Sequence, residues 1–242
     1  PRVRRPSPEG YTALAGDLAK GKSIGQPFAP DGKTTFKDMG APKVDEPVTA
    51  QLIQNALSIV EVQTAHKVEN GAVAGVGFTA KEFVALFDPA MPPTDAQRAA
   101  AVALQFELVL KRKPTPAESE RFVALMRKTT DDAGQTAGAR YALAAVLLLP
   151  EAFFRMEVGS GAPDAKGRVR LSPREIAFAV SSALPDRRPD AELLAAAATG
   201  KLDTDAGVAE QVRRLLADDK TDKPRVLRFF REYFGYDKAV EV

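Results

Sequence analysis

The sequence PTPAESERFVALM, residues 114–126, carries the clearest helix start in this chain. Thr115 precedes Glu118 by three residues, the spacing of a capping box, in which hydroxyl and carboxylate each bind an amide of the first turn. Pro116 takes the first helical position, where its fixed φ suits a helix and its missing N–H costs nothing. Apolar side chains then recur along one face, at Phe122, Leu125 and Met126. The segment therefore predicts an amphipathic α-helix.

The same start signal recurs along the chain and sets the expected fold class. Three further capping boxes are predicted, pairing Thr79 with Glu82, Thr94 with Gln97, and Ser172 with Glu175. Apolar residues at helical spacing follow Ser172 and return in residues 208–216 and 226–234. No run shows the sustained alternation of a strand. We therefore expect an all-α fold, an orthogonal multi-helix bundle with an extended, largely irregular N-terminal arm.

One segment, YALAAVLLL at residues 141–149, is apolar on all sides. A helix of this kind is expected to be central and surrounded by others. Pro150 is predicted to end it. The segment is too short to cross a bilayer, so no membrane span is expected.

Composition shifts predict four segments along the chain. Residues 1–46 are rich in Gly, Pro and Lys and predict an extended arm or linker. A helical segment is expected at residues 47–112, starting at Asp45 and Pro47 and fraying near His66. A small helical module follows at residues 113–160, and a second module, truncated at its C-terminal end, at residues 161–242.

The bulk composition limits the chemistry available to the 242 residues. A formal net charge of +2 argues against a dedicated nucleic-acid binder, so no nucleic-acid partner is expected. The absence of cysteine removes disulfides, thiolate metal sites and covalent c-type haem attachment. Because His66 is the one histidine, a histidine-rich zinc site is excluded as well. Catalytic residues stay unassigned, and no metal or cofactor site is predicted in this chain.

His66 is the first candidate site residue, as a general base or an axial haem ligand. It is expected near a helix C-terminus, in the sequence QTAHKVENG, where the helix dipole favours histidine. This structural role is the alternative, because no second ligand or triad partner is near in the sequence. The glycine-containing loop of residues 71–77 lacks the strand and the Lys-Ser/Thr ending of a phosphate cradle, and is expected to be a connector.

Arg155 and Glu157 are the second candidates, following the apolar helix in PEAFFRMEV. A structural ion pair between them is the alternative to a site. Carboxylates elsewhere serve caps or helix ends. The arginines of residues 225–231 are expected on a solvated face of the last helix, opposite an aromatic packing face.

The C-terminal 130 residues resemble modules of large exported planctomycete proteins. The sequence of residues 111–157 is similar to a helical module in which a T/S-P-x-E helix leads to the ending L-x-S-P-x-F-L-F/Y-R, here LLLPEAFFR with Leu149 in place of serine. Residues 170–238 resemble the adjoining uncharacterised domain. The matching positions are Leu171, Ser172, Glu175, Ala177, Ser181, Leu184, Pro189, Asp190, Glu192, Leu193 and Leu194. The family's tryptophan is absent.

The resemblance implies an extracytoplasmic location, periplasmic or secreted, and a setting beside a cytochrome-c-like haem domain. It implies a haem on a separate part or partner, and it implies that the chain is a fragment of a longer protein. Two functions stay open. One is a non-catalytic structural or interaction module whose partners are other domains or chains of the same protein. The other is part of an extracytoplasmic hydrolase or oxidoreductase acting on extracellular polymer, with an active site shared with absent domains.

Overall fold

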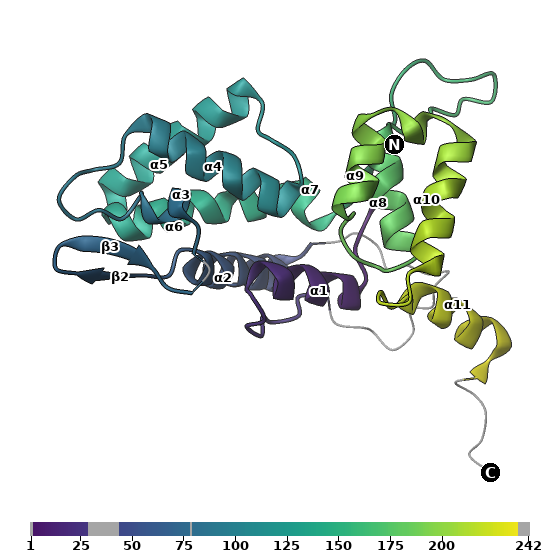
Figure 1. Cartoon of the computed structure of the whole chain (residues 1–242), viewed down its shortest axis with the longest axis horizontal. Helices are drawn as coiled ribbons and strands as arrows, with labels where there is room; N and C mark the ends of the chain where they lie inside the picture. Colours follow the sequence, from purple (N-terminus) through teal and green to yellow (C-terminus); the bar gives the residue numbers. More distant parts are fainter. Residues whose placement is uncertain (1, 29–43, 78, 237–242) are drawn as a thin grey trace, which may run out of the picture. The chain divides into compact units, whose positions relative to one another are not determined.

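A computed structural model describes residues 2–28, 44–77 and 79–236 of the chain. Helices α1–α11 make up most of these residues, and the described strands form two two-stranded sheets (Figure 1). The expected mostly-α fold is therefore confirmed. No helix among the described residues has both the length and the apolar composition needed to cross a membrane.

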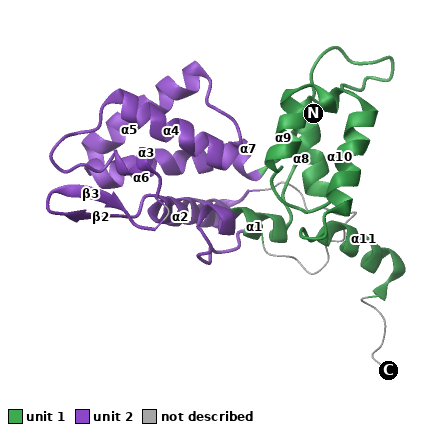
Figure 2. Ribbon diagram, in the orientation of Figure 1, with its two compact units in different colours: residues 1–14, 28–43, 154–242 green, residues 15–27, 44–153 purple. Residues whose placement is uncertain are grey.

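The chain forms two compact units, each described here by itself (Figure 2). Unit 1 comprises residues 1–14, 28–43 and 154–242, and unit 2 comprises residues 15–27 and 44–153. The four segments expected from composition stay a prediction, because compactness does not establish which pieces fold independently.

Unit 2 is built around helix α6 (Gln135–Leu147), which packs against α2 (Glu46–Gln63), α4 (Asp95–Leu110) and α5 (Pro116–Ala133). The short helices α3 (Lys81–Val84) and α7 (Pro150–Phe153) complete its helical part. Most of the apolar run predicted to be central is buried, although Tyr141 and Leu148 are exposed. Leu148 caps α6, and Pro150 opens α7 rather than directly ending α6.

Three of the four predicted capping boxes are confirmed. Those of Thr94, Thr115 and Ser172 each make both reciprocal hydrogen bonds. The box at Thr79 is wrong, since α3 begins one residue later, after Ala80, without a side-chain cap. The Thr79 hydroxyl instead donates to the carbonyls of Ala65 and Val76, at 2.8 and 3.0 Å.

A hairpin replaces the frayed helix end and the glycine loop expected around residue 70. Helix α2 stops at Gln63, and β2 (His66–Glu69) pairs antiparallel with β3 (Ala72–Gly75). Asn70 and Gly71 both have positive φ, 51° and 79°, as the tight hairpin turn for Asn-Gly requires. The Asn-Gly pair was the sequence signal for this hairpin, and the predicted connector at residues 71–77 overlooked it.

Unit 1 gathers helices α8 (Pro173–Ala183), α9 (Ala191–Ala198), α10 (Asp205–Ala217) and α11 (Pro224–Phe234), with the 3-10 turn η1 (Lys201–Asp203). Their buried cluster consists of Ala177, Leu193, Ala196, Leu202 and Leu215. An ion pair adds to this apolar contact, because Arg214 of α10 donates to both carboxylate oxygens of Asp190, the N-cap of α9, at 2.9 and 3.0 Å. Asp190 also caps α9 through the Leu193 amide.

The predicted N-terminal arm contains two ordered elements. Strand β1 (Arg2–Arg4) pairs antiparallel with β4 (Arg155–Glu157), and α1 (Pro8–Leu18) follows it. Tyr11 and Phe28 are buried with their rings edge to face, 5.4 Å apart. The part of the arm at residues 29–43 lies outside the described residues.

Arg112 ties together the junction between α4 and α5 and the start of α7. Its guanidinium donates two hydrogen bonds of 2.8 Å to Glu118 and bonds of 2.8 and 3.0 Å to Glu151. The hydrogen bond from Arg112 is the main reason that the pKa of Glu118 falls to about 2. Glu118 thus serves a salt bridge in addition to its predicted capping box.

Replacing Leu147 by alanine should lower the free energy of unfolding by about 2–5 kcal/mol, because the side chain lies in the packed core of unit 2. Leu147 is 3% exposed, whereas the adjacent Leu148 is 39% exposed and provides a matched control. Urea unfolding followed by circular dichroism measures both. Equal losses for Leu147→Ala and Leu148→Ala would contradict the buried position of α6.

The Arg112 cluster predicts an acid-sensitive contribution to stability. Since the pKa of Glu118 is lower in the fold than the ordinary 4.5, its carboxylate stabilises the fold above about pH 4.5 and loses this effect as the pH falls toward 2. Arg112→Met should cost about 1–2 kcal/mol at neutral pH and flatten this dependence. Urea midpoints between pH 2.5 and 7 test it, with Lys113→Met as the control. Parallel pH curves for wild type and Arg112→Met would refute the assignment.

Candidate functional site

Helix α11 is formed by strong local signals at both ends. Pro224 occupies its first turn, and Gly235 ends it with φ 69°, while the Gly235 N–H donates to the Arg231 carbonyl. Such a left-handed glycine is a common helix stop. The spacing of the side chains between these ends separates apolar from charged residues around the helix.

One side of α11 exposes an unusual number of large apolar side chains. We call this surface the aromatic face, formed by Leu227, Phe229, Phe230, Tyr233, Phe234 and Tyr236. Tyr233 is 67% exposed and Phe230 is 48% exposed. The rings also contact one another: Phe229 stacks with Tyr233 at 5.6 Å, and Phe234 stacks with Tyr236 at the same distance. The aromatic face is thus a continuous exposed apolar surface, and no residue of α11 is buried.

The charged side of α11 is turned toward the rest of unit 1. Arg228 donates to Glu232 at 2.6 Å, and the Glu232 side chain is only 16% exposed. Arg225 and Arg228 lie close enough to Asp186 to influence its pKa, and α11 contacts α8. Within unit 1 the basic side is therefore less solvated than the sequence predicts, whereas the aromatic side is exposed, as a partner surface would be. Periodicity separates the two faces, but it does not show which one the rest of the fold covers.

Asp186 is the buried group beside this charged side. It adopts φ 52°, a left-handed conformation that aspartate tolerates better than most residues. The Ser7 hydroxyl donates to its carboxylate and accepts from the Gly10 N–H at 2.9 Å, so that Ser7 also caps the start of α1. Burial raises the pKa of Asp186, opposed by the Ser7 hydrogen bond and the charges of Arg225 and Arg228. Sequence analysis missed this group, since 179 positions separate it from Ser7.

His66 lies in strand β2 rather than at a helix end. Its ring is half-buried and stacks on Phe87, with centroids 4.3 Å apart and planes within 10°. The Nδ1 atom lies 3.0 Å from the Thr64 carbonyl oxygen. The described residues contain no group of three or more histidine, cysteine or acidic side chains able to hold a metal. The stacking on Phe87 and the contact with the Thr64 carbonyl hold the His66 ring in place within unit 2.

Arg155 and Glu157 lie together on β4, in unit 1, whereas His66 belongs to unit 2. Arg155 approaches Glu157 at 2.7 Å, and Arg4 from β1 reaches the other carboxylate oxygen at 3.0 Å. Burial raises the pKa of Glu157 less than the two arginines lower it. Burial lowers the pKa of Arg155, but a guanidinium keeps its charge. Arg155 and Glu157 thus form the ion pair that the sequence offered as one alternative. Arg4 of β1 binds the same carboxylate and so joins the two strands.

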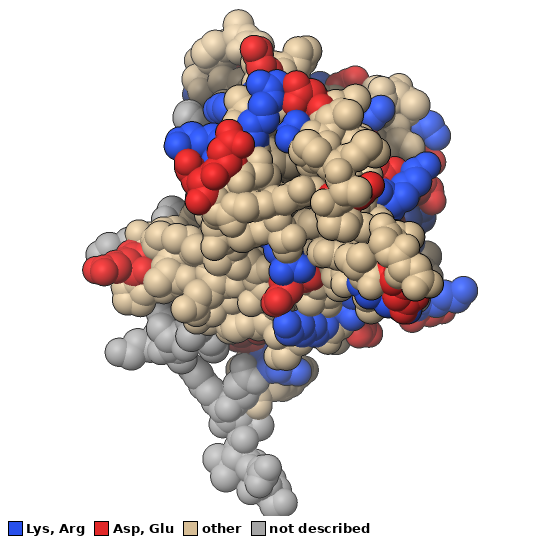
Figure 3. Space-filling view, turned by 90° about the vertical axis from the view of Figure 1, so that its left-hand side faces the viewer, with Lys and Arg blue, Asp and Glu red and all other residues tan. Residues whose placement is uncertain are grey.

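Other candidate carboxylates have structural partners. Glu175 completes the Ser172 capping box and also accepts from the Val158 and Gly159 amides, at 2.7 and 3.1 Å. Asp218 accepts from the Lys220 amide at 2.9 Å. Acidic and basic side chains are interspersed on the face drawn in Figure 3. Among the described residues of unit 1, the aromatic face of α11 is the large exposed apolar surface that these contacts do not account for.

Comparison with known proteins adds one finding. Residues 171–242, which include α8–α11, match the family described as "Protein of unknown function (DUF1592)". The chain thus contains a domain similar to an uncharacterised family. No curated protein and no solved structure matches the chain.

We expect the carboxylate charge of Asp186, rather than the shape of its side chain, to limit the stability of the fold at this position. Asp186→Asn keeps a group that accepts from Ser7 and tolerates positive φ, and removes a charge whose burial is unfavourable. Because the pKa of Asp186 is raised in the fold, ionisation of its buried carboxyl lowers the stability of the wild type as the pH rises above the ordinary value of 3.8. Asp186→Asn should therefore be at least as stable as wild type at pH 7 and show a smaller gain on acidification.

Asp186→Ala is the matched comparison, since it removes the Ser7 bond and places alanine at positive φ. It should cost about 1–3 kcal/mol in thermal or urea unfolding. Equal destabilisation by Asp186→Asn and Asp186→Ala at pH 7 would show that the pairing of Ser7 with a carboxylate, and not with any acceptor, is required.

Proposed function

We propose that the chain is a non-catalytic interaction module, and that the aromatic face of α11 packs on another domain or chain of the same larger protein. The observation that carries this proposal is the orientation of α11, with its charged side turned toward unit 1 and its aromatic side exposed. Contiguous apolar surface of this kind is typical of a protein-protein contact rather than of a free surface.

The composition of the aromatic face favours a helical, apolar partner surface. Phenylalanine and tyrosine dominate it, and these residues contribute a large share of the energy in protein interfaces. Their helical spacing suits a groove between helices, in which residues three and four apart insert side by side. The rings are already in contact with one another, which reduces the entropy lost on docking.

Charge sets a second property of the partner. Helix α11 carries Arg225, Arg228 and Arg231 against a single acidic residue, Glu232. Arg231 is exposed, and Arg228 donates to Glu232. A partner surface bordered by carboxylates would complement this excess, and such complementarity steers association and orientation.

The proposed setting is an exported bacterial protein of the planctomycete type, located outside the cytoplasm and associated with a cytochrome c that takes part in electron transfer. Support for this setting comes from the motif resemblance of the C-terminal 130 residues, and the family match over residues 171–242 supports only an uncharacterised domain there. In this proposal the haem belongs to another domain or chain, and unit 1 supplies a docking surface that keeps that domain in place.

Photo-crosslinking from the aromatic face tests the proposal. A photoreactive phenylalanine analogue at position 230 should crosslink, in the source cells, to a peptide of the same protein or of a haem-carrying chain. Mass spectrometry identifies the peptide, and in-gel haem staining of the crosslinked band reports the cytochrome. The same analogue at position 216, where Leu216 is exposed on α10, is the control.

Three outcomes decide between the possibilities. A crosslink from position 230, but not from position 216, to a carboxylate-bordered apolar surface supports the docking role. Crosslinking to lipid or nucleic acid, or equal crosslinking from both positions, contradicts it. A specific protein crosslink without haem in the band retains the interaction role and removes the cytochrome association.

A further inference from the structure

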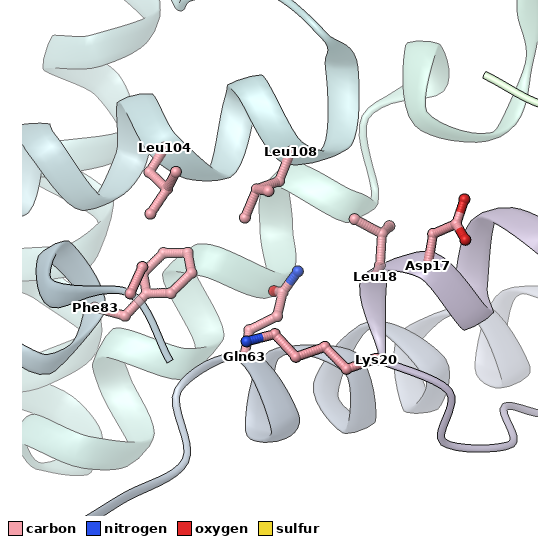
Figure 4. A pocket seen from close by; sticks show the side chains of 8 residues that line it. Asp17, Leu18, Lys20, Gln63, Phe83, Leu104 and Leu108 are labelled. Atoms are coloured by element: carbon pink, nitrogen blue, oxygen red, sulfur yellow. The ribbon is translucent and has the colours of Figure 1, made fainter. Parts of the chain in front are cut away.

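Unit 2 contains a pocket between α3, α4, the end of α2 and the segment that ends α1 (Figure 4). Its volume is about 150 Å³. Leu18, Phe83, Leu104 and Leu108 form most of the wall, with Ala80, and their side chains point inward. An engineered protein cavity of about this size, lined by apolar side chains, accepts a molecule as large as benzene. The pocket is therefore large enough for a single six-membered ring.

One buried amide provides a polar group within this apolar wall. Gln63 is 3% exposed, and its Oε1 accepts from Gln105 Nε2 at 3.1 Å. Gln105 Nε2 also donates to the Leu143 carbonyl at 3.4 Å, and a carbonyl accepts only. In this arrangement Gln105 presents its nitrogen to both groups, and Gln63 presents its oxygen to Gln105. This arrangement leaves the Gln63 Nε2 hydrogens as the donors available on the pocket side.

Lys20 brings a positive charge to the same pocket. It follows α1 with φ 53°, a left-handed conformation in which glycine is the usual residue. Its side chain extends back along the pocket in the direction of Gln63 (Figure 4). Lys20 is exposed as a whole residue, and partial burial of its ammonium lowers its pKa.

We propose that this pocket binds a small monocarboxylate with an aromatic or short aliphatic body, of the size of benzoate. The hydrocarbon part would occupy the space between Phe83, Leu104 and Leu108. The carboxylate would accept from the Lys20 ammonium and the Gln63 amide. Asp17, exposed at the rim, disfavours ligands with a second carboxylate, because like charges repel. This site is independent of the docking role proposed for α11, since all of its residues belong to unit 2.

Benzoate titration of the whole chain, with ¹³C-labelled leucine methyls observed by NMR, tests the proposal. We expect a dissociation constant of about 1 mM, as suits a ligand of this size. The largest shifts should fall on Leu18, Leu104 and Leu108. The isosteric neutral ligand benzamide should bind more weakly, since it lacks the charge that pairs with Lys20.

Two variants separate the charged from the apolar contribution. Lys20→Gln should weaken benzoate about five- to tenfold and leave benzamide unchanged, because a charge-assisted hydrogen bond is lost. The exposed Lys22→Gln is the matched control and should leave both ligands unchanged. Leu104→Trp should fill the pocket and abolish binding of both.

Several results would overturn the proposed carboxylate site. No methyl shifts up to about 20 mM benzoate, twenty times the expected dissociation constant, would overturn the site. Shifts centred on residues outside the pocket, or equal benzoate affinity in wild type and Lys20→Gln, would do the same. If Leu104→Trp fails to fold, as judged by circular dichroism, the methyl map of the wild type and the Lys20→Gln comparison still decide the question.

Discussion

The close contact between α5 and α6 at Gly138 is the constraint on which unit 2 depends. A Cβ atom at Gly138 would lie 2.3 Å from the Thr129 carbonyl oxygen, far inside van der Waals contact. With glycine there, the two helix backbones approach closely, and the Thr129 hydroxyl donates to the Gly138 carbonyl at 2.8 Å. This approach places α6 within reach of α2 and α4 as well. The missing side chain at Gly138 thus permits the close packing of α6 on α5 from which the helical core of unit 2 is built.

Helix starts could be predicted from the sequence because their chemistry is local. The partners in the Thr94, Thr115 and Ser172 boxes lie within three residues, so neighbouring packing has little opportunity to change them. Thr79 shows where the rule fails, since its hydroxyl binds the Ala65 carbonyl, which only the folded hairpin brings near. The hairpin itself was predictable from Asn70 and Gly71, and the glycine-rich context obscured it.

The candidate sites were less predictable, because their partners are distant in the sequence. Arg155 and Glu157 were recognised as a pair, but the contribution of Arg4 depends on the pairing of β1 with β4. Asp186 gave no sequence signal, since Ser7 and the arginines of α11 reach it only in the fold. The same limitation applies to α11, whose covered side is set by Asp186 and α8 and not by its own amphipathic pattern. In the pocket, Lys20 and Gln63 come from segments 43 positions apart, and neither forms a motif.

The pairing of β1 with β4 has a consequence for the order in which the protein forms during synthesis. Unit 1 is discontinuous, because residues 15–27 and 44–153 belong to unit 2. A ribosome delivers the chain from the N-terminus, so residues 2–4 leave it long before their partners at 155–157. Helices α2–α7 are complete by then, and they can collapse around α6 while β1 still has an unpaired edge. Closing this long loop is slow relative to local helix formation. During that interval the nascent chain exposes a strand edge, and a chaperone or an early domain of a longer protein would find it accessible.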